Sequence, residues 1–274
     1  MTGPQVSYLT GGRLHLNHGP IDLICQAWGQ ASDISDAYDR AIARFETVLT
    51  ELTAELPALR AENSALHGPI ARKMANAVAA FRPTFITPMA AVAGAVADAI
   101  LNVMIAPKIT RAYVNNGGDI ALHLGSGQSL TCAIGTSRHR VTLRDTDIAR
   151  GIATSGWGGR SHSLGIADSV TVLAKTAAKA DAAATMIANA VNLCHPAITR
   201  APACSLQADS DLGNRLVTVH VGLLTALETA HALDNGLAAA QTFRDSGLIE
   251  AAALFLNSTA RIVGPLPVLE PANA

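Results

Sequence analysis

Alternating apolar and polar positions open the chain and predict three antiparallel strands. Residues 6–10 and 13–17 alternate with a period of two, and residues 21–27 do so less cleanly. The tripeptide at 18–20, His-Gly-Pro, has turn chemistry and separates the last two strands. The chain therefore begins with a predicted β-meander, in which Asp22 is expected to be a solvated or hydrogen-bonded carboxylate.

Apolar residues that recur every three or four positions predict the helices that follow. One apolar stripe covers residues 37–56, and Ser32 and Asp33 before it are suitable helix caps. Pro69 can open a second helix over residues 69–81. After an extended, proline-rich break, residues 89–104 predict a helix of small residues, which another backbone can approach closely.

Shorter strands and helices are predicted for the second half of the chain. The predicted strands cover residues 112–115, 120–124, 129–134, 140–143, 169–174, 216–221 and 255–263. The predicted helices cover residues 177–193, 223–232 and 237–243, and irregular structure is expected at 195–204. No internal repeat and no clear linker divides the chain, so residues 1–274 are expected to form a single domain.

Composition removes several classes of protein from consideration. The 274 residues are 49% hydrophobic but only 4% aromatic and 15% charged, and the formal net charge is −1. Because no basic run is present, nucleic acid is not an expected partner. None of the four cysteines stands in a C-x-x-C motif, which predicts reduced thiols rather than a zinc site or a disulfide framework.

The sequence shows neither a signal peptide nor a membrane helix. The start of the chain lacks the basic and apolar regions of a signal peptide. The most hydrophobic stretch, residues 88–105, is interrupted by Asp98 and Asn102 and is shorter than the ~20 apolar residues of a membrane helix. The sequence therefore predicts a cytoplasmic protein without a membrane partner.

Asp181 and Thr185 are candidate metal ligands on the alanine-rich helix. They are four positions apart, so they share one face of that helix. A carboxylate and a hydroxyl are hard oxygen donors that can contribute two ligands to Mg²⁺. The spacing alone favours a structural role, with an aspartate stabilised by the helix dipole and a threonine that bonds back to its own helix.

A second candidate is the turn formed by Asn115, Asn116, Gly117, Gly118 and Asp119. Two glycines after a strand permit positive φ and expose backbone N–H groups, while the flanking amides and the carboxylate can bind a ribose or a heterocycle. An ordinary tight turn explains the same residues equally well.

The loop after residue 151 is the third candidate. It offers hydroxyl groups, a guanidinium suited to phosphate and an imidazole able to transfer protons. The residues concerned are Thr154, Ser155, Gly156, Trp157, Arg160 and His162. The loop matches neither a P-loop nor a G-x-S-x-G nucleophile elbow, and a structural role for His162 stays open.

Five motifs between residues 88 and 192 occur in a characteristic order. They are VAGAVAD at 92–98, NNGGD at 115–119, ATSG at 153–156, His162 before SVTV at 169–172, and ADAAAT at 180–185. This order resembles the ApbE superfamily, whose founding activity is FAD:protein FMN transfer. The resemblance implies an α+β, T-fold-related architecture of antiparallel sheets packed with helices, with the site in about residues 88–192.

The resemblance also implies chemistry at particular residues. Asp181 and Thr185 would hold Mg²⁺, and FAD or another flavin would be the ligand, with an acceptor protein as a further partner and self-association left open. Arg160 would bind phosphate, and His162 would assist proton transfer. The family lysine is Ala93 here, and a D-P-x-T-G segment after the histidine is missing, for part of which Asp168 can substitute.

Three functions therefore remain open. The first is a Mg²⁺-dependent, ApbE-like transferase that acts on a flavin or a similar phosphorylated ligand. The second is a non-catalytic binding or accessory protein on the same fold. The third is an assembly protein whose ancestral site has decayed. Within the superfamily, LNHGPIDL at 16–23 and the segment at 155–168 resemble a compact branch associated with pterin-linked one-carbon metabolism.

Overall fold

The computed structural model describes residues 3–134 and 139–266. The described chain forms two compact units, and each is built from separate segments of the sequence. Unit 1 consists of Met1–Thr131, Thr142–Ala153 and Ala174–Asp181. Unit 2 consists of Cys132–Val141, Thr154–Leu173 and Ala182–Ala274. That the whole chain acts as one domain stays a prediction.

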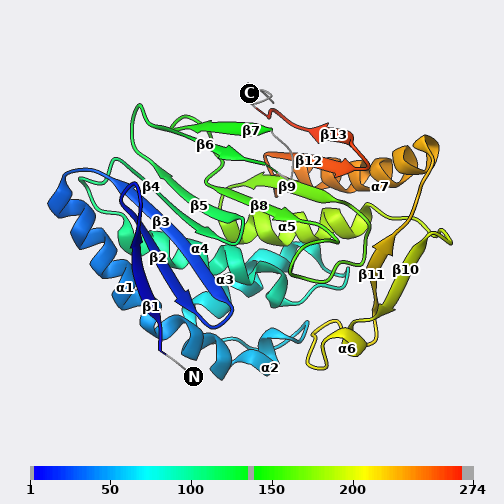
Figure 1. Ribbon diagram of the computed structural model, residues 1–274, viewed down its shortest axis with the longest axis horizontal. Helices are drawn as coiled ribbons and strands as arrows, with labels where there is room; N and C mark the ends of the chain where they lie inside the picture. Colours follow the sequence, from blue (N-terminus) through cyan, green and yellow to red (C-terminus); the bar gives the residue numbers. More distant parts are fainter. Residues whose placement is uncertain (1–2, 135–138, 267–274) are drawn as a thin grey trace. The chain divides into compact units, whose positions relative to one another are not determined.

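Antiparallel strands form the sheet of unit 1 (Figure 1). In order across the sheet they are β1 (Gln5–Leu9), β2 (Arg13–His18), β3 (Ile21–Trp28), β4 (Arg111–Asn116), β5 (Asp119–Leu124) and β8 (Gly151–Ser155), of which the last two residues belong to unit 2. The predicted meander is confirmed. Alternate residues of β2 and β3, such as Leu14, Leu16 and Leu23, are fully buried, so one face of the sheet contributes to the core.

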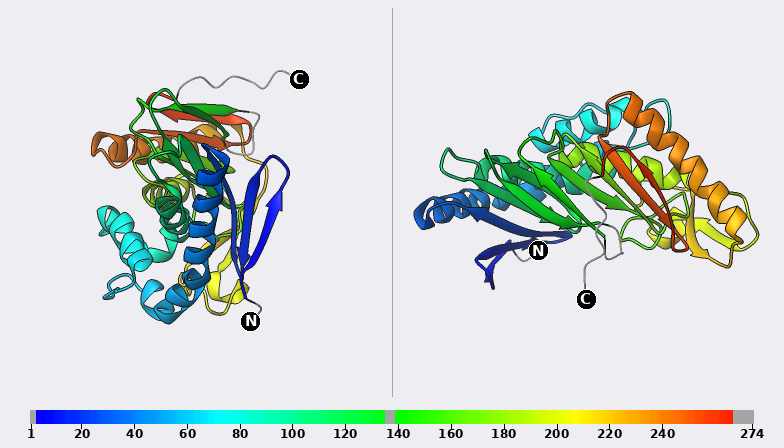
Figure 2. Two further views of the ribbon diagram at one scale, coloured as in Figure 1. Left: turned by 90° about the vertical axis from the view of Figure 1, so that its left-hand side faces the viewer. Right: turned by 90° about the horizontal axis from the view of Figure 1, so that it is seen from above.

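The helices of unit 1 lie on one face of these strands (Figure 2). They are α1 (Ala31–Ala54), α2 (Leu56–Leu59), α3 (Pro69–Val78) and α4 (Val92–Met104), with 3₁₀ turns η1 (Ala79–Phe81) and η2 (Pro88–Ala91). Helix α4 packs against β4 and β5, and α1 packs against α4. The prediction that Ser32 or Asp33 caps α1 is wrong, because the N-cap is Gln30, without a side-chain hydrogen bond.

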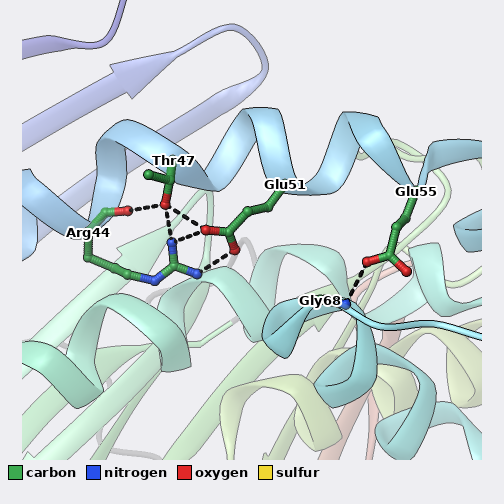
Figure 3. A network of polar contacts seen from close by, with 5 residues as sticks. All are labelled: Arg44, Thr47, Glu51, Glu55 and Gly68. Carbon is green, nitrogen blue, oxygen red and sulfur yellow. Dashed lines mark hydrogen bonds and ion pairs between the residues drawn. The ribbon is translucent and has the colours of Figure 1, made fainter.

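Polar contacts secure the exposed side of α1 and the start of α3 (Figure 3). The Arg44 guanidinium donates to both carboxylate oxygens of Glu51, each at 2.7 Å. The Glu55 carboxylate accepts the backbone N–H groups of His67 and Gly68, also at 2.7 Å, and Gly68 is the N-cap of α3. The half-buried pair of Arg44 and Glu51 is close enough to water to add little stability, whereas Glu55 supplies acceptors to N–H groups at a helix start.

We expect Glu55→Gln to change how stability depends on pH. The two N–H groups lower the pKa of Glu55 below its ordinary value of 4.5, so its ionised form stabilises the folded protein. This contribution is present above that value and is lost as the pH falls through the lower, folded pKa. Denaturant titrations between about pH 3 and pH 6 should show that the variant lacks this part of the loss in unfolding free energy. The control is Glu46→Gln, an exposed change on the same helix that should leave the profile unchanged.

Unit 2 contains two antiparallel groups of strands. Strand β9 (Ser169–Ala174), whose last residue belongs to unit 1, pairs with β12 (Ala251–Leu256), and β12 pairs with β13 (Thr259–Val263). Strands β10 (Ile198–Pro202) and β11 (Leu216–Val221) form the second group. Strands β6 (Ser129–Ala133) and β7 (Arg140–Arg144) also pair, but residues 129–131 and 142–144 of these strands belong to unit 1. The helices here are α6 (Ala203–Leu206), α7 (Ala226–Asp245), which packs on β12 and β13, and α5 (Ala177–Ala190) from Ala182 onward.

Several element predictions for this half need correction. The two helices expected at 223–232 and 237–243 are the single helix α7, which begins at a capping box formed by Thr225 and Glu228. The strand expected at 255–263 belongs to a hairpin whose turn residues, Asn257 and Ser258, both have positive φ. The irregular segment at 195–204 contains β10, and the loop expected from 151 begins with β8.

The fold class is confirmed, since helices pack against antiparallel sheets in both units. All four cysteines are free, and Cys25 is buried. No helix in residues 3–134 and 139–266 is both long and apolar enough to span a bilayer.

Candidate functional site

A two-residue hairpin joins β4 to β5 and carries the predicted asparagine–glycine turn. Asn116 and Asp119 are register partners, and the residues between them have φ angles of 64° at Gly117 and 114° at Gly118. The Asn115 side chain accepts the N–H of Gly118 at 2.8 Å. Positive φ at both turn positions explains why glycine occupies each of them. The turn is therefore well defined by its own residues.

One peptide group of α4, between Ala93 and Gly94, joins this hairpin to Asp181. The buried Asn116 side chain donates to the Ala93 carbonyl at 3.1 Å. The Gly94 N–H donates to Oδ2 of Asp181 at 3.0 Å. Both ends of a single peptide are thus held by residues that the sequence motifs had singled out. The structure brings together the Asn116 turn, the small-residue helix and Asp181.

Close approach of backbone explains the small residues of α4. A Cβ on Gly94 would lie 2.3 Å from the carbonyl oxygen of Ala177, so only glycine fits there. Asp98, one turn further along α4, accepts the N–H groups of Ala177 and Ala178 at 3.1 and 3.2 Å. These N–H groups belong to the first turn of α5, where an acceptor is needed. Asp98 therefore positions the helix that carries Asp181.

The charges around Asp181 favour a nearby cation. Burial raises the pKa of Asp181 well above its ordinary value, and the neighbouring carboxylate of Asp119 raises it further. Hydrogen bonds from the backbone at Gly94 and Ala93 oppose this shift in pKa. Asp181 and Asp119 are both half-buried, so water screens their charges only in part. A cation there would relieve the repulsion between two partly buried carboxylates.

The donor set at Asp181 would suit Mg²⁺, because this ion needs few side-chain ligands. Within residues 3–134 and 139–266, no group of three or more His, Cys, Asp or Glu side chains is arranged to hold a metal ion. Mg²⁺ commonly takes one or two carboxylates and completes its shell with waters and phosphate oxygens. Asp181 supplies such a carboxylate, and Thr185 lies one turn further along α5. Thr185 as a ligand stays a prediction.

The loop residues of unit 2 are held by contacts within that unit. The hydroxyl groups of Thr154 and Thr171 lie 2.8 Å apart, which fixes the end of β8 to β9. A Cβ on Gly156 would lie 2.3 Å from the carbonyl oxygen of Asp168, so the two ends of the loop meet backbone to backbone. Ser155 is half-buried beside them. The glycine serves close packing at this position.

Asp168 has a structural role that the sequence did not indicate. One carboxylate oxygen accepts the indole N–H of Trp157 at 3.4 Å, and the other accepts the backbone N–H of Asn257 at 2.7 Å. The backbone N–H of Trp157 also donates to the Ala167 carbonyl at 3.0 Å. Asp168 therefore fastens the loop to the turn after β12. Its predicted contact with a ligand stays a prediction.

Arg160 and His162 lie in the same loop and are more accessible. Arg160 is exposed and His162 is half-buried, and neither forms a hydrogen bond or ion pair with the part of the chain that the structure describes. Side chains of Asn189 and Asn192 hold the segment just after His162, at Leu164. No motif spacing identified these two asparagines, because their contact depends on tertiary packing.

Comparison with known proteins identifies the family. A family profile described as "AbpE bacteria" matches residues 6–262. A UPF0280 protein of Methanococcoides burtonii is 38% identical over 133 residues, which cover 45% of this chain and 54% of that protein. A UPF0280 protein of Archaeoglobus fulgidus is 37% identical over 124 residues, covering 45% and 51%. These matches span about half the length of each relative.

Comparison with solved structures matches the apo form of the Pseudomonas stutzeri flavinyl transferase ApbE. It has a TM-score of 0.41 and 11% identity, and the match covers 96% of this chain and 95% of that one. The profile match covers nearly the whole chain, and the ordered motifs fall within it. The chain therefore belongs to the AbpE bacteria family and is a member of the ApbE-like superfamily.

Proposed function

We propose that this protein binds Mg²⁺ together with a flavin nucleotide or a similar phosphorylated ligand, and acts as an ApbE-like transferase. The observation that carries the proposal is the arrangement around Asp181, whose carboxylate is held by Gly94 and faces the charge of Asp119. Family membership supports the flavin chemistry, and the raised pKa of Asp181 supports the cation.

Each predicted site residue has a role in this proposal. Asp181 and Thr185 would hold Mg²⁺, which supplies positive charge to ligand phosphates when bound. Asn115 and the N–H groups of the glycine turn would contact the sugar or ring of the ligand. Arg160 presents an exposed guanidinium suited to a phosphate group, and His162 presents an imidazole for proton transfer. The remaining predicted contacts are from Asn116, Gly117, Gly118, Asp119, Thr154, Ser155, Gly156, Trp157 and Asp168.

Ligand-dependent stabilisation tests the proposal directly. A ligand present at ten times its Kd stabilises the folded protein by about 1.4 kcal/mol, which raises the melting temperature measurably. We expect FAD to raise it only when Mg²⁺ is present, and EDTA to reverse the rise. The control ligand is riboflavin, which carries the same ring without phosphate. If neither FAD nor FMN shifts the melting temperature with Mg²⁺ present, the proposal is wrong.

A binding protein without turnover is the second candidate. It is favoured by the short connection from His162 to β9, in which both oxygens of Asp168 are already used within the protein. Its ligand would be a flavin, a pterin or another small molecule. Native mass spectrometry of freshly purified protein should then show an unchanged, noncovalent ligand. Covalent flavin on an acceptor protein after incubation with FAD would establish the transferase instead.

A further inference from the structure

A pocket of about 280 Å³ opens in unit 1, where α3 meets the start of α5. Its lining residues are Pro69, Arg72, Lys73, Asn76, Ala77, Thr176, Ala178 and Lys179. None of them belongs to the motifs that identify the family or to the predicted flavin site. The pocket is thus a separate feature of the fold.

Three of the lining side chains are cations, and none is an acid. Lys73 lies 3.9 Å from the Asp98 carboxylate, which is buried. Arg72 is near enough to Glu55 to lower the pKa of that carboxyl. Lys179 is exposed and has no ion-pair partner among the described residues. Two neighbouring acids therefore offset only part of the charge of three cations, which leaves a positive rim.

The wall of the pocket has a different chemistry from its rim. The buried residues Ala77 and Ala178 line the wall with methyl groups, and Pro69 adds an apolar ring. The aliphatic stems of the two lysines cover further carbon surface. Asn76 and Thr176 supply neutral polar groups at the edge. An occupant that satisfies both parts needs an anionic group and a small apolar body.

The positive character comes from side chains and not from the helix start itself. The N–H groups of Ala177 and Ala178 at the start of α5 are already bonded to Asp98. Lys179 and Asp181 are two positions apart on α5, so they point to different sides of the helix. The Lys179 ammonium group is therefore directed away from the Asp181 carboxylate.

From this geometry we propose that the pocket between α3 and α5 binds a small organic anion, of which a phosphate monoester is the best match. A doubly charged phosphate pairs with the net positive charge of the rim, at Lys179 and at Arg72, whose charge Glu55 offsets only in part, and the planar fork of arginine suits its oxygens. The pocket lies below the ~300–1,000 Å³ of sites for drug-sized ligands, so the organic part is small. The ester carbon atoms contact the apolar wall.

Calorimetric titration with phenyl phosphate tests this proposal. The titrations use Mg²⁺-free buffer with EDTA at low salt, with inorganic phosphate and phenol as comparison ligands. We expect phenyl phosphate to bind, inorganic phosphate to bind about tenfold more weakly and phenol not to bind. Affinity should fall with added salt. Equal binding of phenyl phosphate and inorganic phosphate would show an adventitious ion only and would overturn the proposal.

Variants test whether phenyl phosphate binds in this pocket. The double variant Arg72→Gln/Lys179→Gln should lose about tenfold or more in affinity while it keeps the wild-type melting temperature. The matched control is Lys175→Gln, which removes an exposed charge just before α5 but outside the pocket. Asp181→Asn should keep full affinity, because the pocket does not use the flavin site. Unchanged binding in the double variant, or an equal loss in Lys175→Gln, contradicts the assignment.

Discussion

Asp181→Asn is expected to raise the melting temperature of the metal-free protein and to abolish its response to Mg²⁺. The carboxylate is surrounded by protein and lies near Asp119, so its ionised form is disfavoured in the fold. Asparagine keeps an oxygen for the Gly94 N–H and offers Asp119 a donor instead of a like charge. Removing a poorly compensated buried charge gains on the order of 1–2 kcal/mol, or a few degrees.

The pH dependence of stability gives the sign of this effect. A raised pKa means that folded Asp181 holds its proton at a pH where the unfolded chain has released it. Metal-free wild-type protein therefore gains stability as the pH falls through the folded pKa of Asp181 toward its ordinary value of 3.8. The variant lacks this gain, so the two stability curves should converge in acid and separate near neutral pH.

Melting curves with EDTA and with Mg²⁺, recorded from pH 4 to pH 8, check both parts. The matched control is Asp39→Asn, which removes an exposed carboxylate on α1 and should change neither the melting temperature nor the response to Mg²⁺. A variant that Mg²⁺ stabilises as strongly as it stabilises the wild type would falsify the metal assignment. A melting temperature below that of the wild type in EDTA would contradict the charge argument.

Gly94→Ala should destabilise unit 1 and weaken ligand binding at the same time. The added methyl group would lie 2.3 Å from the Ala177 carbonyl oxygen and 2.7 Å from the Ala178 nitrogen, and both are backbone atoms that cannot rotate away. Overpacking costs about 1–3 kcal/mol, and more where only backbone can yield. Alanine returns about 1 kcal/mol of helix propensity. We expect a net loss on the order of 2 kcal/mol.

Denaturant unfolding and Mg²⁺-dependent flavin binding measure the two consequences. Binding should weaken because moving α4 away from α5 lengthens the hydrogen bond between Gly94 and Asp181. The control is Gly158→Ala, where an added methyl group meets nothing within 4 Å and φ is not positive. A stable Gly94→Ala protein with wild-type binding would show that the helices separate freely at this point.

Periodicity predicted most elements, and its errors have local causes. Asp234, Asn235 and Gly236 look like a turn, yet they lie inside α7. A Cβ on Gly236 would lie 2.2 Å from Val191, so the glycine allows close packing rather than ending the helix. In the same way, Gly151 was read as a loop residue but lies in β8, where the backbone of unit 1 leaves no room for a side chain.

The site was predictable in its parts but not in its connections. Spacing placed Asp181 on a helix and Asn116 in a turn, but neither residue's partner follows from its neighbours in the sequence. The bond from Gly94 to Asp181 joins residues 87 positions apart, and Asp98 reaches 79 positions to Ala177. Asp168 was predicted to replace part of a missing segment, and its bond to Asn257, 89 positions away, could not be read from the sequence. Tertiary pairing over such distances leaves no periodic signal.

The segmented make-up of unit 1 has a consequence for its biosynthesis. Its first 131 residues are synthesised first, but Ala174–Asp181 follows only after part of unit 2 has been made. Until then the Gly94 N–H lacks its carboxylate acceptor and Asp98 lacks the amides that it caps. The nascent chain therefore cannot complete the proposed cation site before residue 181 of 274 is available. Unit 1 therefore completes its fold only with Ala174–Asp181, a segment that is synthesised late.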